Sequence, residues 1–212
     1  MGMLKYALAL AACAVVANVQ AGTEDYKRLG ERPPAGQVKT DYYRFKYTAP
    51  REVFADIEWN AFADKQEKRN TVMVIGLSGY DTYALSVLYK GPAAEGMDAL
   101  AVAQSKYPNL TFAPSSNPAC VSTAPDRPFA LDERMVGFVA MCMDASTHGM
   151  YELNLSWRSM SLMMQPLDTL IAESSQCAAD KRKDPDTRCG DRITPYAASF
   201  NTFLASFSTT GK

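Results

Sequence analysis

Apolar and polar side chains alternate along several segments of the chain, and a period of two predicts β-strands. Residues 43–47 alternate aromatic with basic side chains, which indicates a half-buried strand. Residues 71–77 are almost continuously apolar and β-branched, as in a strand buried on both faces. After a turn at 78–81, residues 83–89 alternate again. The last two segments therefore predict a hairpin, which Gly91 and Pro92 should end.

A second hairpin is predicted further along the chain. Residues 134–143 are apolar on both faces, and residues 151–158 alternate cleanly between apolar and polar side chains. The polar stretch 144–149 between them is typical of a turn. The alternation at 151–158 predicts that this hairpin has one face in solvent.

Four segments have helical spacing or helical end signals. Residues 50–61 begin with a proline and carry apolar side chains on one face, although part of the segment also alternates as a strand would. Residues 97–107 predict a helix ended by a proline, and residues 166–178 predict another. Residues 194–207 begin with Thr-Pro as a cap and first turn. Their aromatic stripe, which should dock on the sheet, consists of Tyr196, Phe200, Phe203 and Phe207.

Three segments lack periodicity. Residues 22–40 are polar and proline-containing, which predicts a flexible leader. Residues 110–132 hold four prolines and predict a long loop, and residues 180–188 form a charged one. The whole pattern predicts an α+β domain over residues 41–212, with a mainly antiparallel sheet of two hairpins plus an N-terminal strand, covered by three to four helices.

The N-terminus has the features of an export signal. Lys5 precedes an apolar run that ends at Ala17, and Val19 and Ala21 supply the small residues of a cleavage site. Residues 1–21 are therefore expected to be removed, and the run is too short to span a bilayer permanently. Leu-Ala-Ala before Cys13 also matches a lipoprotein cleavage box, so a form that is lipid-anchored through Cys13 is the alternative. We expect a periplasmic or secreted protein without a transmembrane segment after cleavage.

Composition narrows the class of protein. The chain is 21% charged and 47% hydrophobic, which argues against disorder and suits one domain. Lys5 is the one charged residue in the signal, so cleavage changes the formal net charge from −1 to −2. Without a basic stripe, nucleic-acid binding is not expected.

Cysteine usage agrees with export. Removal of the signal leaves an even set of four cysteines, which permits three pairings. We favour Cys120–Cys142 and Cys177–Cys189, because each closes a short loop between adjacent elements. The alternative is four buried free thiols, which is less common in an oxidising compartment.

No set of residues predicts catalysis or a cofactor. The sequence at 76–80 departs from a nucleophile elbow, which needs glycine where Tyr80 stands. A Ser-His-acid triad could use one histidine, His148, which falls in a predicted turn. The paired acids in the chain fit helix ends and solvated loops equally well. These features favour a protein that is not an enzyme and that has no cofactor.

A weak copper option rests on methionine. Met141 and Met143 share one face of a predicted strand, and thioethers suit Cu(I). Because methionine is also a flexible filler of cores, the structural interpretation is favoured over a metal site.

Three surfaces are candidates for binding. The first is a cationic and aromatic strip on the N-terminal strand, which could meet an acidic partner or could simply protect a sheet edge. The second is the proline-rich loop, and the third is the charged loop near the second disulfide. The candidate residues are Tyr42, Arg44, Lys46, Pro114, Asn117, Arg127, Lys181, Arg182, Lys183 and Arg188.

The leading hypothesis is a non-catalytic binding or accessory protein of the cell envelope, which recognises a protein or glycan through its loops. Two alternatives come from other classes. One is an envelope hydrolase or isomerase, and the other is a methionine-based Cu(I)-handling protein.

Overall fold

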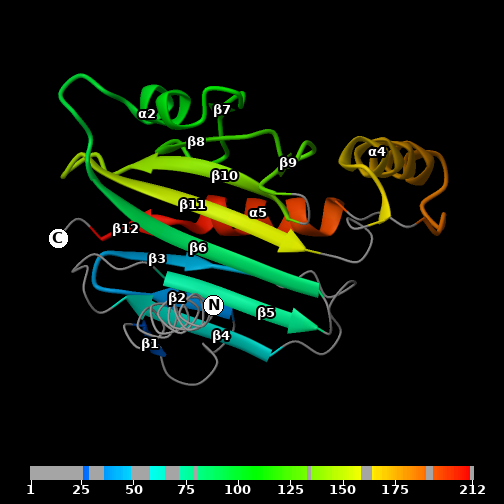
Figure 1. The fold of residues 1–212 in the computed structure, drawn as a ribbon, viewed down its shortest axis with the longest axis horizontal. Helices are drawn as coiled ribbons and strands as arrows, with labels where there is room; N and C mark the ends of the chain where they lie inside the picture. The colour runs from blue at the N-terminus through cyan, green and yellow to red at the C-terminus, as the bar shows by residue number, and fades with distance from the viewer. Residues whose placement is uncertain are drawn as a thin grey trace, which may run out of the picture.

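The computed structural model describes residues 26–28, 36–48, 58–64, 72–78, 81–132, 135–158, 164–189 and 193–210. Across these ranges the chain combines large antiparallel sheets with helices, which confirms the α+β class (Figure 1). The expected signal, including Cys13, lies outside the described residues. So do residues 50–57, the first part of the expected helix 50–61.

Twelve strands and three helices make up the described part of the chain. The strands are β1 (Tyr26–Arg28), β2 (Gln37–Lys39), β3 (Tyr43–Lys46), β4 (Glu58–Asp64), β5 (Val72–Ser78), β6 (Asp81–Pro92), β7 (Ala113–Pro114), β8 (Cys120–Ser122), β9 (Phe129–Ala130), β10 (Val136–Met143), β11 (Gly149–Arg158) and β12 (Ser208–Thr209). The helices are α2 (Ala99–Lys106), α4 (Leu167–Lys183) and α5 (Thr194–Ser206).

Both predicted hairpins are present and lie side by side at the centre of the main sheet. Among the described residues this sheet has nine strands, in the order β1-β4-β5-β6-β11-β10-β8-β7, with β9 paired to β10. All of its pairings are antiparallel, and β11 joins the two hairpins by pairing with β6 along its whole length. Strands β6 and β11 therefore have partners on both sides.

The predicted N-terminal strand forms, but in a different sheet. β3 is the middle strand of a second, three-stranded sheet in the order β12-β3-β2. Its aromatic side chains are buried and its basic ones are exposed, as the alternation predicted. The prediction of a single sheet was wrong because one partner of β3, β12, comes from the far end of the chain.

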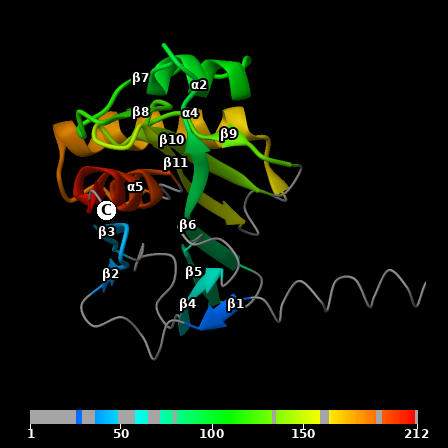
Figure 2. The same ribbon diagram turned by 90° about the vertical axis from the view of Figure 1, so that its left-hand side faces the viewer.

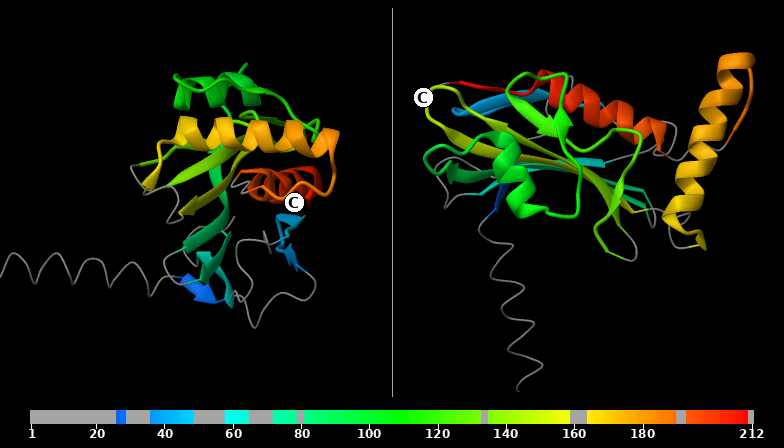
Figure 3. Two further views of the ribbon diagram at one scale, coloured as in Figure 1. Left: turned by 90° about the vertical axis from the view of Figure 1, so that its right-hand side faces the viewer. Right: turned by 90° about the horizontal axis from the view of Figure 1, so that it is seen from above.

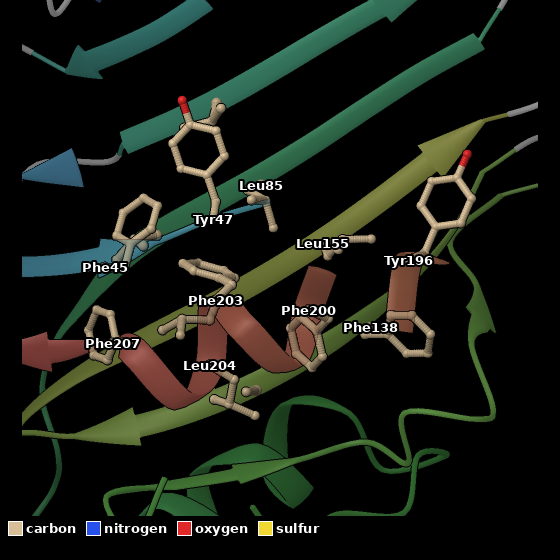
Figure 4. Close-up of a cluster of buried hydrophobic side chains, with 14 of the residues drawn as sticks. Phe45, Tyr47, Leu85, Phe138, Leu155, Tyr196, Phe200, Phe203, Leu204 and Phe207 are labelled. Atoms are coloured by element: carbon tan, nitrogen blue, oxygen red, sulfur yellow. The ribbon is translucent and has the colours of Figure 1, made fainter. Parts of the chain in front are cut away.

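The larger hydrophobic core lies between the main sheet and a layer formed by α5 and the small sheet (Figure 2). The predicted aromatic stripe of α5 fills it. Phe203 packs on Phe45 with ring centroids 4.7 Å apart, and Phe200 packs on Phe138 at 5.4 Å (Figure 4). Each fully buried aromatic side chain contributes on the order of 1.5–3 kcal/mol through removal of apolar surface from water.

A smaller core lies on the opposite face of the sheet under α2. Asp98 caps this helix by accepting a hydrogen bond from the Ala101 amide at 2.8 Å, close to the predicted start. Ala99 and Ala103 are buried and face the sheet, where they pack in one cluster with Met141. Small side chains let the helix approach the strands closely.

Helix α4 extends further than predicted and stands at one end of the sheet (Figure 3). Of its 17 residues, Leu170, Ser174 and Cys177 are buried. The first half of the expected charged loop 180–188 is therefore not a loop, because residues 180–183 form the last turn of this helix. The prediction assumed that this helix covers a face of the sheet. Instead, α4 stands at one end of the sheet and covers neither face (Figure 3).

Three other segments differ from their predictions. The expected leader 22–40 contains strands β1 and β2. In the expected helix 50–61, the described end belongs to β4, so the alternating interpretation holds there. The expected loop 110–132 contains β7, β8 and β9, which extend the sheet beyond β10. Strands of two or three residues are too short to show periodicity in the sequence.

Both disulfides have the favoured pairing. Cys120 and Cys142 face each other on β8 and β10, with their Cα atoms 4.0 Å apart. Cys177 of α4 is joined to Cys189 in the segment that returns from the helix, with a Cα separation of 5.7 Å. Each cross-link closes a short loop, which the chain-entropy model values at about 3 kcal/mol.

Candidate functional site

A buried carboxylate lies where the C-terminal end of α2 meets the centre of the main sheet. Glu152 projects from β11 on the α2 side, and its side chain is 4% exposed. One oxygen, Oε1, accepts hydrogen bonds from the Tyr107 hydroxyl and the Asn154 amide, each at 3.0 Å. The other, Oε2, is paired with Lys106 Nζ and lies 3.7 Å from Lys90 Nζ. These five residues are called the Glu152 cluster below.

The cluster fixes the protonation states of Glu152 and Tyr107 near neutral pH. Burial alone would raise the pKa of Glu152, but hydrogen bonds from Lys106 and Asn154 and the charges of Lys106 and Lys90 outweigh it and lower this pKa. Burial, followed by the charge and hydrogen bond of Glu152, raises the pKa of Tyr107 above its ordinary value. Glu152 is therefore an ionised acceptor and Tyr107 a protonated donor.

This arrangement suits attachment and orientation rather than proton transfer. Both oxygens of Glu152 already accept from side chains, and its lowered pKa makes it a poor base near pH 7. The interactions tie the end of α2 to strands β6 and β11. They also hold the ammonium groups of Lys90 and Lys106 near Glu152, close to the C-terminal ends of β6 and α2. The side chains of these lysines are 36% and 37% exposed.

The sequence pattern pointed Glu152 toward solvent, and that prediction was wrong. Alternation along β11 predicted that Glu152 lies on the solvent-exposed face of the sheet. In the structure, α2 covers the part of this face where Glu152 lies. The helix is distant in sequence, so local periodicity carries no sign of it. The available signal was the pairing of a basic residue and a tyrosine, Lys106 and Tyr107, at the end of a predicted helix.

The proline-rich segment contributes one buried residue and two exposed ones. Asn117 is 8% exposed, and its amide donates to the carbonyls of Leu204 and Phe207 at 3.0 and 2.8 Å. It therefore caps the end of α5 and offers no side chain to a partner. Pro114, on β7, and Arg127 are exposed.

The cationic strip is exposed but does not lie on a sheet edge. Arg44 donates from Nε to Ser208 Oγ at 3.0 Å, which links β3 to β12. Lys46 is exposed, and Tyr42 is half-buried against the larger core. Because β3 has partners on both sides, the edge-protection interpretation does not apply to it.

The four basic residues near the second disulfide gather at the far end of α4. Lys181, Arg182 and Lys183 form its last turn, and Arg188 lies in the return segment; all four are exposed. Lys183 Nζ lies 4.0 Å from Asp180. Basic groups at this position also favour the negative end of the helix dipole.

Met141 and Met143 suggested the Cu(I)-handling alternative, and His148 suggested the hydrolase or isomerase alternative. Met141 is fully buried under α2 and Met143 packs beside it, which supports their role as core residues. His148 is exposed in the β10–β11 turn, where its φ is +54°. The described side chains contain no group of three or more His, Cys, Asp or Glu residues that could hold a metal ion.

The fold defines an α+β protein with a mainly antiparallel sheet and two disulfides. No helix in the described ranges has the length and apolar character needed to cross a bilayer. Comparison with known proteins adds no assignment, since no family model, curated protein or solved structure matches the chain.

Proposed function

We propose that this chain is an exported, non-catalytic binding or accessory protein of the cell envelope, which recognises a protein or glycan through segments displayed at its surface. Support for export comes from the signal-like N-terminus together with two disulfides. Disulfides of this kind persist in oxidising compartments such as the periplasm or the extracellular space.

One observation carries the binding proposal: α4 reaches away from the sheet, and a disulfide ties its return segment back to it (Figure 3). The inner end of the helix is anchored because Leu167, Leu170 and Ile171 pack against the larger core. The outer end displays charged side chains. A cross-linked segment loses less conformational freedom when it binds, so more of its contact energy remains as affinity.

The partner surface that fits this end of α4 is acidic. Lys181, Arg182 and Arg188 are exposed on the last turn and the return segment. Arginine can bind carboxylates through two parallel hydrogen bonds, which gives direction as well as attraction. Nearby Asp184 and Asp186 would help to exclude partners that are acidic throughout.

Capture from native envelope extract tests the proposal. The tagged mature chain is compared with an Arg182→Glu, Arg188→Glu variant and with Lys39→Glu as a control, since Lys39 is exposed on β2. We expect one partner to be recovered with the wild type and the control and lost with the double variant. Recovery of nothing, or of the same molecules with all three proteins, would count against recognition through α4.

A further inference from the structure

The small sheet presents a cationic surface to solvent. The exposed side chains of β2 and β3 are Gln37, Lys39, Arg44 and Lys46. The side chains that alternate with them are buried in the larger core. Gln37 lies opposite Lys46 and Lys39 lies opposite Arg44 on the neighbouring strand, so all four point to the same side. Ser208 of β12 lies opposite Arg44 and joins them. These five residues are called the outer face below.

The cations of the outer face are not paired with acids. Within the described residues, the ammonium groups of Lys39 and Lys46 make no hydrogen bond or ion pair. Arg44 donates from Nε to Ser208 Oγ, which carries no charge. Of the described residues that form this sheet and its turns, the acidic one is Asp41, between β2 and β3. Three cations therefore stand beside one acid.

Two of these cations form an unfavourable pair. Lys39 and Arg44 are directly opposite each other on adjacent antiparallel strands, where like charges are destabilising. The hydrogen bond to Ser208 draws the Arg44 guanidinium toward β12, on the side away from β2. The positive charge is therefore spread across the sheet instead of converging on one point. An extended anionic surface would relieve the repulsion, whereas a single small anion would not reach all three cations.

We propose that the outer face docks on a bilayer that contains anionic lipids, with Lys39, Arg44 and Lys46 next to the phosphate-bearing headgroups. Each cation near such a surface should strengthen binding about fivefold, so the three together should contribute about a hundredfold. Loss of Lys5 with the signal changes the formal net charge from −1 to −2, so the attraction has to come from a local patch. The inference rests on the proposed function, because bilayers border the compartments to which exported proteins are delivered.

Other partners fit the outer face less well. Protein partners rely on apolar or aromatic anchors, and the apolar side chains of β2 and β3 are turned into the core. A flexible acidic polymer would lose conformational freedom when it places its charges across three strands. The headgroups of a bilayer already lie in one plane, so they avoid that loss.

The outer face and the basic end of α4 are separate surfaces. Through its return segment, α4 leads into the N-terminal end of α5. The small sheet is attached near the other end of α5, where Ser206 Oγ accepts a hydrogen bond from the Lys46 amide at 2.8 Å (Figure 3). Each surface can therefore be altered without the other.

Sedimentation with sucrose-loaded vesicles is the direct test. The tagged mature chain should partition about a hundredfold more strongly onto vesicles of phosphatidylcholine with phosphatidylglycerol than onto phosphatidylcholine alone. This preference should fall as salt rises, because salt screens exposed charges. Arg44→Gln should weaken partitioning onto the anionic vesicles about fivefold. Arg127→Gln removes the same charge from another exposed position and should leave partitioning unchanged.

Two further variants separate docking from a structural role. Lys39→Gln should weaken partitioning, yet raise the melting temperature by about 1–2 °C because the like-charge pair is lost. Gln37→Glu places a carboxylate opposite Lys46, so it should weaken partitioning while every cation remains. Gln104→Glu adds the same charge at an exposed position on α2 and is the control. Thermal unfolding of each variant verifies that the fold is retained.

The outcomes separate this inference from the proposed function. Equal partitioning onto both kinds of vesicle, equal losses with Arg44→Gln and Arg127→Gln, or unchanged partitioning of folded Gln37→Glu would each overturn docking through the outer face. Binding of soluble polygalacturonate as tightly as the anionic vesicles would instead assign the face to a polymer and also overturn it. Since Lys39→Glu should still allow capture through α4, failure on vesicles with successful capture removes the bilayer inference alone. Vesicle binding without capture removes recognition through α4 alone.

Discussion

Replacing Glu152 by glutamine should measure how much the Glu152 cluster stabilises the fold. Glu152→Gln keeps the shape of the side chain but removes its charge. The side-chain amide nitrogen of the new glutamine would then place N–H donors next to Lys106 Nζ. In the wild type, this position holds the carboxylate oxygen that accepts from Lys106. Tyr107 and Asn154 could still donate to the remaining oxygen.

The expected loss in free energy of unfolding is about 2 kcal/mol. A hydrogen bond to a charged group contributes about 1.5–3 kcal/mol net. The carboxylate is 4% exposed, which favours the upper part of that range. However, the Lys106 side chain is 37% exposed, so water replaces part of what it loses.

Urea unfolding at pH 7 gives this free energy, with Glu173→Gln on α4 as the control because Glu173 is exposed. A double-mutant cycle with Lys106→Met isolates the pair, and we expect a coupling of about 1 kcal/mol. If Glu152→Gln unfolds at the same urea concentration as the wild type, or if the coupling is zero, the proposed attachment of α2 is refuted.

The same comparison has a pH dependence whose sign is fixed. An unfolded glutamate has a pKa of about 4.3, and the pKa of folded Glu152 is lower. The stabilisation is therefore complete above the unfolded pKa and is lost as pH falls through the folded pKa. The stability gap between wild type and Glu152→Gln should shrink below about pH 4, and a gap that stays constant down to pH 3 would contradict the assignment.

Three further changes test other parts of the fold. Asn117→Ala removes two hydrogen bonds to the end of α5 and should lower the free energy of unfolding by about 2 kcal/mol, whereas alanine at exposed Ser116 should leave it unchanged. Cys177→Ser with Cys189→Ser should cost about 3 kcal/mol by chemical denaturation, and unchanged stability would mean that this cross-link does not constrain the unfolded chain. Gly137→Ala would place a Cβ 2.5 Å from the Leu155 carbonyl oxygen, so a melting temperature equal to that of the wild type would contradict the close approach of β10 and β11.

Local patterns predicted the elements whose environment is set by their own residues. The alternation at 151–158 and the apolar run at 71–77 became β11 and β5 within one or two residues. The aromatic stripe of α5 had helical spacing, and its side chains fill the larger core. In β11 and α5, one face of the element is buried along most of its length, so periodicity is strong.

Patterns failed where a distant segment determines the environment. β3 pairs with β12, so its neighbour is fixed by residues more than 160 positions later. Glu152 is covered by α2, and Asn117 is buried against α5. Such contacts depend on the tertiary arrangement, and local periodicity does not encode them.

The disulfide pairing was predictable for a different reason. Cys120 lies on β8 and Cys142 on the adjacent strand β10, and Cys177 and Cys189 lie on either side of the C-terminal end of α4. Short loops between adjacent elements bring such residues together with little loss of chain entropy. The charged loop was expected to include Lys181, Arg182 and Lys183, but these residues form the last turn of α4.

Mass spectrometry of the native chain from the envelope fraction, unreduced and after alkylation, tests most directly that it is an exported and cross-linked protein. We predict a polypeptide that begins at Gly22 and resists alkylation, with proteolytic peptides joined through Cys120–Cys142 and Cys177–Cys189. A cytosolic chain that still carries residues 1–21 and has four alkylated cysteines beyond Cys13 would contradict the account.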